Sequence, residues 1–451
     1  MSLGFDVRDE DRVANEVGEL LSAMIRNACV NDGSETSGHE SRNVATLTDF
    51  FASCGLPVEV YEPAPGRGSL VARLEGRNPE APSLLLIGHT DVVPADDANW
   101  LHDPFGGELI DGVIWGRGAV DMLNLTASMA AAMRQASLDG WTPEGDITFV
   151  ASADEECGSR FGAEFLTTQT PHDLRADHVL TEAGGFPLDL GSGPLRPVIV
   201  GEKGVHWFKL VVHGVPGHGS QPLRTDNAVV KAAECIRRLA AFTPRVNMTE
   251  PWRRFVEDAN LAAPLGDALT DPVALDALVE TLDDVALARQ IHACTHLTIA
   301  PTRVDGGTKT NVIPDRVEIE LDVRSLPGQS SEDVRGVVID ALGDLASSVT
   351  ISTTLDDVAS VSPIDTALWD LCQQATDLFA PGARNVAYLT VGATDARFFR
   401  RSGSVAYGFG MFSDAISFEQ FGAMFHGDNE RVDTRSLWLS TQLWDFLIRS
   451  H

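Results

Sequence analysis

The fold can be inferred from one stretch, Leu84-Leu85-Leu86-Ile87-Gly88-His89-Thr90-Asp91-Val92-Val93-Pro94. Its apolar run predicts a buried strand whose carboxyl end carries polar groups, which is where open α/β sheets hold their functional residues. His89 and Asp91 are two residues apart and would share one face of the strand. The carboxylate could accept the hydrogen bond that fixes the imidazole tautomer, as metal-binding histidines usually require. The stretch alone fits an ordinary strand end equally well.

The size and composition of the chain limit its class. Its 451 residues exceed one ordinary core and predict two domains. A net charge of −31 argues against a nucleic-acid partner, and no apolar stretch is long enough to span a membrane. Six scattered cysteines without a Cys-x-x-Cys pair favour reduced thiols, and the charged stretch Met1 to Arg12 has no signal-peptide pattern. We therefore expect a cytoplasmic protein.

Apolar periodicity on either side of the central strand predicts an α/β sandwich. The expected elements are helices over residues 13–28, 40–54 and 122–137, strands over 58–61, 69–74, 147–151 and 177–180, and a hairpin over 106–115 around Asp111-Gly112. The strands at 147–151 and 177–180 are followed by Asp154-Glu155-Glu156 and by Glu182. Three apolar strands therefore each end in carboxylates or histidine.

The pattern changes near residue 204, where the elements follow the order β-α-β-β-α-β of a ferredoxin-like fold. The expected strands lie at 205–212, 297–304, 317–323 and 349–354, and the expected helices at 226–241 and 331–345. An acidic, helix-rich insert at about 251–291 lengthens this part. From about 363 the chain returns to the first domain, with elements at 369–379, 387–390 and 437–448. We expect a first domain made of residues 1–203 and 361–451 and an inserted domain of residues 204–360.

Five side chains are candidate metal ligands: His89, Asp121, Glu156, Glu182 and His426. Nitrogen and oxygen ligands in this mixture suit zinc, cobalt or manganese better than calcium. Asp121 lies in a glycine-flanked turn that opens a helix, and it could bridge two cations about 3.5–4 Å apart.

The doublet Glu155-Glu156 follows a strand, so its two carboxylates face different ways. We assign Glu156 as a metal ligand and Glu155 as the general base that takes a proton from the attacking water. Acidic pairs at strand ends are otherwise usually solvated, so the assignment depends on the rest of the cluster.

These residues resemble the motifs of a known family. The matching stretches are His89-Thr90-Asp91, Trp115 to Asp121, Asp154-Glu155-Glu156 and Phe425 to Glu430. They are similar, in the same order, to those of the di-zinc metallopeptidase family that includes aminoacylase, glutamate carboxypeptidase, acetylornithine deacetylase and succinyl-diaminopimelate desuccinylase. The resemblance covers nearly the whole chain. It implies a mixed-sheet α/β/α domain with two metal ions, interrupted by a ferredoxin-like lid that also forms a homodimer.

The resemblance also implies roles for the site residues. It distributes the ligands between two ions, with His89, Asp121 and Glu182 on one and Asp121, Glu156 and His426 on the other. Asp91 becomes the residue that orients His89, and Glu155 becomes the base that later protonates the leaving amine. One departure from the family pattern follows Asp121-Met122, where Leu123-Asn124 replaces the usual lysine and removes a positive charge that we expect near the site entrance.

Further matches concern the substrate. His218, in the loop 214–220, resembles the family histidine that reaches into the partner subunit's site and stabilises an oxyanion. Asn311 and Arg324 lie in motifs similar to the family's substrate-side motifs of the lid, and Arg397 ends a similar loop, 392–397, of the first domain. Either arginine could hold the substrate carboxylate in a bidentate pair or form an ordinary salt bridge.

The sequence therefore predicts a metal-dependent hydrolase that cleaves the amide bond of a dipeptide or N-acyl amino acid bearing a free carboxylate, with two divalent ions, most simply zinc. A specific biosynthetic deacylase of the acetylornithine or succinyl-diaminopimelate type is the alternative within enzymes. A non-catalytic relative that uses the lid for binding is the alternative outside them, and the presence of Glu155 with all five ligand types argues against it.

Overall fold

Strand β3 (Leu84–His89) lies inside the main sheet with all six residues buried. The computed structural model describes residues 7–169 and 174–451, so the first half of the charged N-terminal stretch lies outside the described residues. None of the helices in these two ranges has the length and hydrophobicity needed to cross a membrane.

The main sheet has ten strands, in the order β1-β2-β6-β3-β7-β18-β9-β16, with β8 and β17 pairing to β9. Strand β3 runs parallel to both neighbours, whereas β2 is antiparallel to β6, so the sheet is mixed as predicted. The strands are β1 (Val58–Tyr61), β2 (Ser69–Leu74), β6 (Ile147–Ser152), β7 (His178–Thr181), β8 (Leu188–Asp189), β9 (Pro194–Glu202), β16 (Ser360–Val361), β17 (Arg384–Thr390) and β18 (Val405–Gly408). Sequence periodicity did not predict β9 and β18, although both lie within the sheet.

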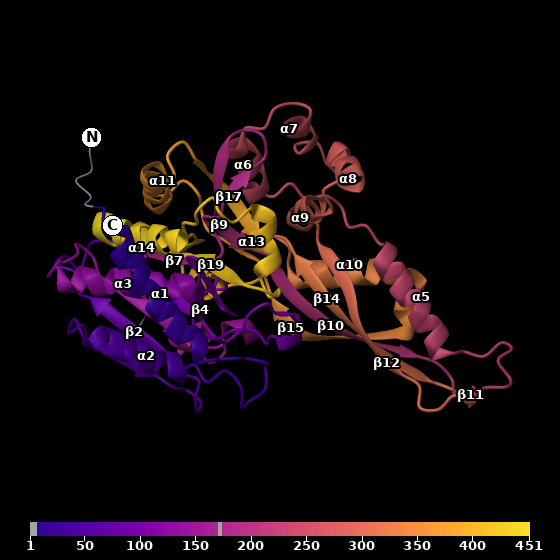
Figure 1. Ribbon diagram of the computed structural model, residues 1–451. Helices are drawn as coiled ribbons and strands as arrows, with labels where there is room; N and C mark the ends of the chain where they lie inside the picture. The colour runs from indigo at the N-terminus through magenta and orange to yellow at the C-terminus, as the bar shows by residue number, and fades with distance from the viewer. Residues whose placement is uncertain (1–6, 170–173) are drawn as a thin grey trace.

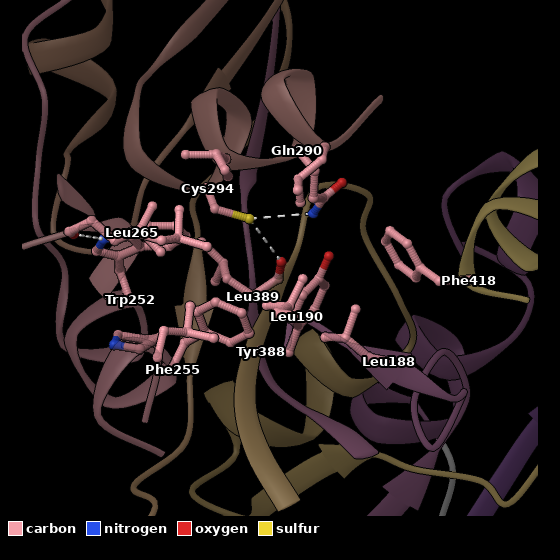
Figure 2. Close-up of a pocket in the computed structure, with 15 residues that line it drawn as sticks. Leu188, Leu190, Trp252, Phe255, Leu265, Gln290, Cys294, Tyr388, Leu389 and Phe418 are labelled. Atoms are coloured by element: carbon pink, nitrogen blue, oxygen red, sulfur yellow. Dashed lines mark hydrogen bonds between the residues drawn. The ribbon is translucent and has the colours of Figure 1, made fainter. Parts of the chain in front are cut away.

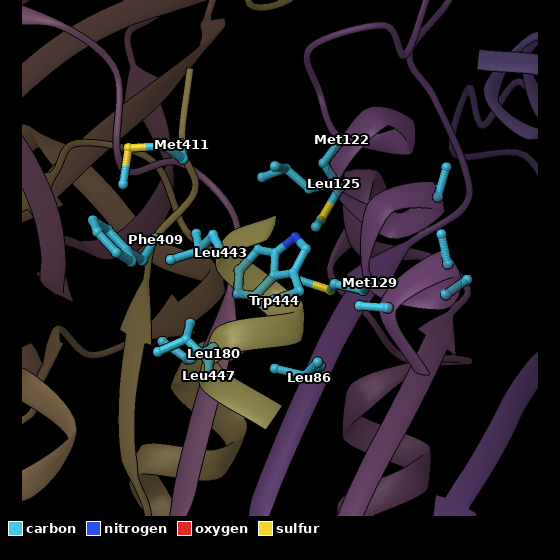
Figure 3. Packing of buried hydrophobic residues seen from close by; sticks show 14 of the residues in the cluster. Leu86, Met122, Leu125, Met129, Leu180, Phe409, Met411, Leu443, Trp444 and Leu447 are labelled. Carbon is cyan, nitrogen blue, oxygen red and sulfur yellow. The ribbon is translucent and has the colours of Figure 1, made fainter. Parts of the chain in front are cut away.

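Helices cover both faces of this sheet. Successive side chains of a strand point to opposite faces, so alternate residues of β3 enter two different apolar cores, one on each face. Leu84 and Leu86 belong to the larger core, whereas Leu85 and Ile87 belong to a smaller one. The larger core contains α1 (Glu10–Arg26), α2 (Ser41–Ala52), α3 (Leu123–Leu138), α11 (Ala367–Phe379) and α14 (Thr434–Ser450), and the smaller contains α4 (Ala163–Thr168) and α12 (Ala396–Arg401). Trp444 of α14 is fully buried among Met129, Leu86 and other apolar side chains (Figure 3). The predicted α/β/α sandwich is confirmed.

A small second sheet carries the turn that leads to Asp121. Its strands are β4 (Glu108–Ile110), β5 (Val113–Trp115) and β19 (Arg431–Asp433). Asp111 and Gly112 join β4 to β5 with φ values of 50° and 78°, the conformation that tight hairpins require. Strand β19 follows His426 and pairs with β5, so this sheet brings the segment before Asp121 and the segment after His426 together beside the site.

The inserted domain has the predicted ferredoxin-like order. Its antiparallel sheet runs β12-β14-β10-β15, and its helices pack on that sheet around a separate apolar core. The elements are β10 (Gly204–His213), α5 (Ala228–Ala241), β12 (Thr298–Gly306), β14 (Arg316–Ser325), α10 (Ser331–Leu342) and β15 (Val349–Asp357). A short ribbon of β11 (Gly217–His218) and β13 (Val312–Ile313) lies at the end farthest from β2 and β7 (Figure 1).

The acidic insert is helical, as predicted, but it does not extend the ferredoxin-like core. It forms α6 (Glu250–Ala259), α7 (Leu265–Ala268), α8 (Pro272–Thr281) and α9 (Val285–Thr295). Trp252, Phe255 and Leu275 of these helices share an apolar core with Leu195 of β9 and Val386 of β17. The insert therefore packs on the edge of the main sheet (Figure 1). The domain division at 203/204 and 360/361 stays a prediction, consistent with β10 beginning at Gly204 and β15 ending at Asp357.

Candidate metal centre

The carboxyl ends of three neighbouring strands meet at one point, as the sequence predicts. His89 is the last residue of β3 and pairs with Ser152 at the end of β6. Glu155 and Glu156 follow in a short 3-10 helix (Glu155–Cys157), and Glu182 comes directly after β7. Because parallel strands end at the same edge of a sheet, side chains from distant parts of the sequence converge here.

Asp121 lies between the two histidines. Its Oδ1 is 3.2 Å from His89 Nε2, and its Oδ2 is 3.3 Å from His426 Nε2. Glu182 Oε2 lies 3.6 Å from the same nitrogen of His89, and Glu156 Oε2 lies 3.1 Å from His426 Nε2. The five side chains thus form two sets that share Asp121, which is the arrangement a bridging carboxylate needs.

Glu430 holds the turn that carries Asp121. Its Oε1 accepts hydrogen bonds from the backbone N–H groups of Val120 (2.6 Å) and Asp121 (2.8 Å). Its Oε2 accepts from the N–H of Gly118 (2.9 Å) and from Arg117 Nη1 (3.0 Å). Glu430 is fully buried, so these four contacts are screened from water. The sequence motif included Glu430 but gave it no role.

Asp91 orients the neighbouring residues, but not only in the way predicted. His89 Nδ1 is 2.9 Å from the backbone oxygen of Asp91 and 3.5 Å from its carboxylate. The Asp91 carboxylate accepts hydrogen bonds from the backbone N–H groups of Glu155 (3.2 Å) and Glu156 (3.1 Å). Asp91 therefore fixes the backbone of the acidic doublet, and the contact between Nδ1 and the carbonyl fixes the imidazole.

A buried charged network beneath the site was missed in the sequence. Arg67 Nη2 donates to Glu40 Oε1 and to Asp154 Oδ1, both at 2.7 Å. Asn31 Nδ2 donates to Asp91 Oδ2 (2.9 Å) and to Asp154 Oδ1 (3.1 Å). All five side chains are buried, and the network ties the base of the site to the loop before Glu155. No local spacing could have revealed it, because the partners come from four separate segments.

The protein groups carry a local excess of negative charge. Burial, followed by repulsion from Glu182, raises the pKa of Glu155 well above its usual value. Burial is also the main cause that raises the pKa of Glu182 to about 7, and Asp121 and Glu156 add to the effect. Burial lowers the pKa of His89, but Glu182, Asp121 and Asp91 outweigh it and hold this pKa well above its usual value. Clustered carboxylates with two imidazoles are the donor set that divalent cations of the zinc type take up, so the residues fit such ions.

Two positions that the sequence analysis placed near the substrate, Leu123-Asn124 and Arg397, are buried in the structure. Leu123 and Asn124 are both buried at the start of α3, so the missing lysine would have stood in the interior rather than at the site entrance. Arg397 is also buried; its Nε lies 3.1 Å from Asp357 at the end of β15, and its Nη1 donates to the backbone oxygen of Thr394. This pairing agrees with the salt-bridge interpretation of Arg397, and a role in substrate binding stays a prediction.

Arg324 is partly exposed on β14 and forms a bidentate pair with Asp322, with distances of 2.7 and 3.0 Å. It lines a cavity together with Lys203 and Gly392, the first residue of the predicted substrate loop. The cavity therefore brings a guanidinium of the inserted domain opposite a loop of the main domain.

His218 and Asn311 lie far from the metal ligands of their own chain. They are exposed neighbours at the ribbon tip, where Gly219 N–H donates to the Asn311 carbonyl oxygen and His218 Nδ1 contacts Ser220 Oγ at 2.8 Å. Figure 1 shows β11 at the outer end of the inserted domain. Neither side chain can serve the metal centre of its own chain in this conformation.

Comparison with known proteins agrees with this geometry. The model of peptidase family M20/M25/M40 matches residues 85–450. The chain is 26% identical to a Xenopus tropicalis protein described as N-fatty-acyl-amino acid synthase/hydrolase PM20D1, over 100% of this chain and 88% of the relative. It is 34% identical to aminoacylase-1 of Sus scrofa over 44% of this chain and 48% of the relative.

A solved structure shares the fold. The M20 family metallo-carboxypeptidase Sso-CP2 from Sulfolobus solfataricus superposes with a TM-score of 0.72 at 17% identity, covering 96% of this chain and 98% of that chain. The family model spans well over half of the chain. The chain therefore belongs to peptidase family M20/M25/M40.

Proposed function

We propose that the protein is a metal-dependent hydrolase that cleaves the amide bond of an N-acyl amino acid or dipeptide bearing a free carboxylate. One observation carries this proposal. Asp121 lies within 3.3 Å of both His89 and His426, and Glu155 stands beside the same cluster. Two divalent ions, when bound there, supply the Lewis acidity that polarises the substrate carbonyl and lowers the pKa of water. Zinc fits the donors, and cobalt and manganese are the alternatives to test.

We assign the other roles in the reaction to side chains of this chain. His89, Asp121, Glu156, Glu182 and His426 are the proposed ligands. Glu155 takes a proton from the attacking water and delivers it to the leaving nitrogen. Its raised pKa suits this task, because burial makes the carboxylate a better base than one in water. Asp91 holds the backbone of Glu155 in place through its hydrogen bond.

We propose that the active unit is a homodimer. His218 is exposed at the ribbon tip, beyond reach of its own metal centre, so it would act in the site of a second copy. There its imidazole would donate a hydrogen bond to the oxyanion of the tetrahedral intermediate. Asn311 lies beside it and would reach the same substrate. Arg324 would bind the substrate carboxylate by exchanging its partner Asp322.

The family relatives support acylated amino acids and dipeptides as the substrate class. The full-length match to an N-fatty-acyl-amino acid synthase/hydrolase and the partial match to aminoacylase-1 favour N-acyl amino acids. A dedicated biosynthetic deacylase is not favoured, and the intact ligand set argues against a non-catalytic role. Six free cysteines, four of them buried, are consistent with a cytoplasmic location.

The proposal is tested by hydrolysis of a panel of N-acyl amino acids and dipeptides. The protein is first treated with a chelator and then loaded with zinc, cobalt or manganese. We expect turnover only after loading and only with substrates that keep the free carboxylate. Equal turnover of the matching amides, in which the carboxylate is blocked, would contradict the proposed substrate class. Equal turnover by the chelated protein would contradict the metal requirement.

The shared site is tested by mixing two inactive variants. His218→Ala and Glu155→Ala each disable a different half of a shared site, so mixed dimers contain one site with both residues intact. We expect the mixture to recover part of the activity after subunit exchange. No recovery, with exchange verified by native mass spectrometry, would contradict the role of His218 across the interface. Val273→Ala, on the exposed face of α8, is the control and should be fully active alone.

A further inference from the structure

Asp395 is a buried carboxylate in the loop 392–397, which follows β17. The residue is 2% exposed; Ser152 Oγ donates a hydrogen bond to its Oδ2 at 2.7 Å, and Ser159 Oγ donates to its Oδ1 at 2.5 Å. Burial raises the pKa of Asp395, although the hydrogen bonds from the two serines and the charge of Arg397 act against it. A carboxylate is costly to bury, and an amide or a hydroxyl would join the same segments at lower cost. This indicates a role for Asp395 beyond packing.

The two serines lie at the two ends of the segment 153–158, which carries the acidic doublet. Ser152 is the last residue of β6, and Ser159 follows the short 3-10 helix that contains the doublet. The N–H of Ser159 donates to the carbonyl oxygen of Asp154 at 2.6 Å, which closes the segment into a tight loop. Asp91 accepts hydrogen bonds from N–H groups in the middle of the segment. The contacts of the two serines therefore hold the ends, which Asp91 does not reach through these bonds.

The loop that carries Asp395 is itself firmly held. It follows β17, which pairs with β9 and whose Tyr388 packs against Phe255 of the insert, with 5.9 Å between the ring centroids (Figure 2). Glu202, the last residue of β9, accepts hydrogen bonds from the backbone N–H and from the hydroxyl of Thr394. Both the strand before the loop and the loop itself are thus fixed to the main sheet. A side chain supported in this way can hold a neighbouring segment in place.

Arg397 joins this support to the inserted domain. Its Nη2 lies 3.4 Å from the hydroxyl oxygen of Ser159, and its Nε lies 3.1 Å from the carboxylate of Asp357 at the end of β15. The charges of Arg397 and Asp395 attract each other. The guanidinium therefore lies against the same hydroxyl as Asp395 and offsets part of the buried negative charge.

We infer that Asp395 is a positioning residue for the general base, and that it acts by holding both ends of the segment that carries Glu155. The inference rests on the proposed function, in which Glu155 must meet first the attacking water and then the leaving nitrogen. Proton transfer requires hydrogen-bond distance, and a displacement of about 1 Å can lower a rate by about 100-fold. The loss of this support should therefore lower kcat, with little change in KM or in metal content.

The kinetic test compares Asp395→Ala with Asp395→Asn, each loaded with zinc to the wild-type content, on the N-acyl amino acid that the wild type cleaves fastest. For Asp395→Ala we expect kcat to fall by about 10- to 100-fold and KM to change by less than about twofold. Asp395→Asn should keep kcat within about threefold, because its amide oxygen can accept from one serine hydroxyl and its NH₂ group can donate to the other. Equal losses in the two variants, or a loss that appears only in KM, would overturn the inference.

Asp445→Ala is the matched control. Asp445 is also a buried carboxylate, but its partners Arg8 and Arg449 both reach Asp139, at the end of α3 farthest from the metal centre. We expect this variant to melt at a lower temperature and to keep the wild-type kcat at equal zinc content. A loss of kcat as large as that of Asp395→Ala would mean that losing any buried carboxylate slows the reaction, and it would overturn the inference.

Ser152→Ala keeps the inference testable if Asp395→Ala does not fold, because it removes one hydrogen bond and leaves the carboxylate in place. We expect kcat to fall by about threefold or more, since one end of the segment is released. When the two substitutions are combined, Ser152→Ala should cause no further loss in the Asp395→Ala background. Unaltered kcat in Ser152→Ala, or additive losses in the double variant, would overturn the inference.

Hydrogen exchange of the same samples tests the support without any substrate. The N–H groups of Glu155, Glu156 and Ser159 are hydrogen-bonded, so their exchange reports how often the segment opens. We expect Asp395→Ala to speed exchange in peptides that span 153–159 by about tenfold or more, and Asp395→Asn to leave it within about threefold of wild type. If the wild type hydrolyses no substrate, the proposed function fails, and exchange then decides whether Asp395 holds the segment: faster exchange in Asp395→Ala supports this, and wild-type exchange overturns it. If the wild type is active and Asp395→Ala keeps its kcat, the inference alone fails.

Discussion

Glu430→Gln perturbs the support of the metal centre without touching a proposed ligand side chain. The amide oxygen can replace Oε1 and keep the hydrogen bonds from Val120 and Asp121. The amide nitrogen cannot accept, so the N–H of Gly118 and the guanidinium of Arg117 lose their acceptor. Arg117 is then left buried without its charged partner, because its side chain is only 3% exposed.

The magnitude follows from these lost contacts. Removing one partner of a buried ion pair costs about 3–5 kcal/mol, and a hydrogen bond to a charged group contributes about 1.5–3 kcal/mol. We therefore expect Glu430→Gln to lower the free energy of unfolding by about 3–5 kcal/mol. The turn that carries Asp121 loosens as well, and changes of this kind typically lower metal affinity by about 10- to 100-fold.

Metal affinity is measured by titrating cobalt into chelator-treated protein and following its visible absorbance, and stability by denaturant unfolding of the same samples. Glu419→Gln is the matched control, because Glu419 is exposed on α13 (Phe418–Met424) and its loss should change neither quantity. Unaltered cobalt affinity and unaltered stability in Glu430→Gln would refute the reasoning that Glu430 holds the turn.

Three further predictions concern the core, the buried network and pH. Trp444→Ala should destabilise the protein by about 3–5 kcal/mol, measured against Trp207→Ala, which removes a 46% exposed ring; equal effects would contradict the packing account. Arg67→Met should cost about 3–5 kcal/mol because Glu40 and Asp154 lose their buried partner, whereas Arg77→Met, which breaks an exposed pair with Glu144, should cost less than about 1 kcal/mol. Burial raises the pKa of Glu182 from 4.5 to about 7, so its stabilising contribution is complete below the lower value and is lost as pH rises through the higher one. Chelated protein should therefore melt at a lower temperature at about pH 8 than at about pH 5, and Glu182→Gln should reduce that difference; a wild-type melting temperature independent of pH would contradict this.

Local sequence was enough to predict the site where backbone geometry decides the outcome. His89, Glu156 and Glu182 follow apolar strands, and parallel strands bring their ends together whatever lies between them. The ferredoxin-like order was also predictable, because its strands alternate and its helices have clear apolar faces. Strand β9 was missed because Pro194 and Pro197 obscure its apolar run.

Tertiary contacts account for the remaining differences. Asn31, Glu40 and Arg67 belong to loops and to the start of a helix, where no sequence pattern indicates burial, and only the folded chain gives them buried partners. The insert lies within the inserted domain in sequence, yet its apolar side chains find Leu195 and Val386 on the main sheet. Arg397 is the last residue of a substrate-like motif, but Asp357 at the end of β15 pairs with it. Each of these contacts joins segments that no local pattern relates.

The central claim is that Glu155 moves protons at a centre held by other side chains. The most direct measurement compares kcat of wild-type protein and Glu155→Ala, each loaded with zinc to an equal measured content, on the best N-acyl amino acid. The account predicts equal metal content and melting temperature, with kcat reduced by about 10²- to 10⁴-fold in the variant. A variant that holds the same metal and keeps near wild-type kcat would contradict it.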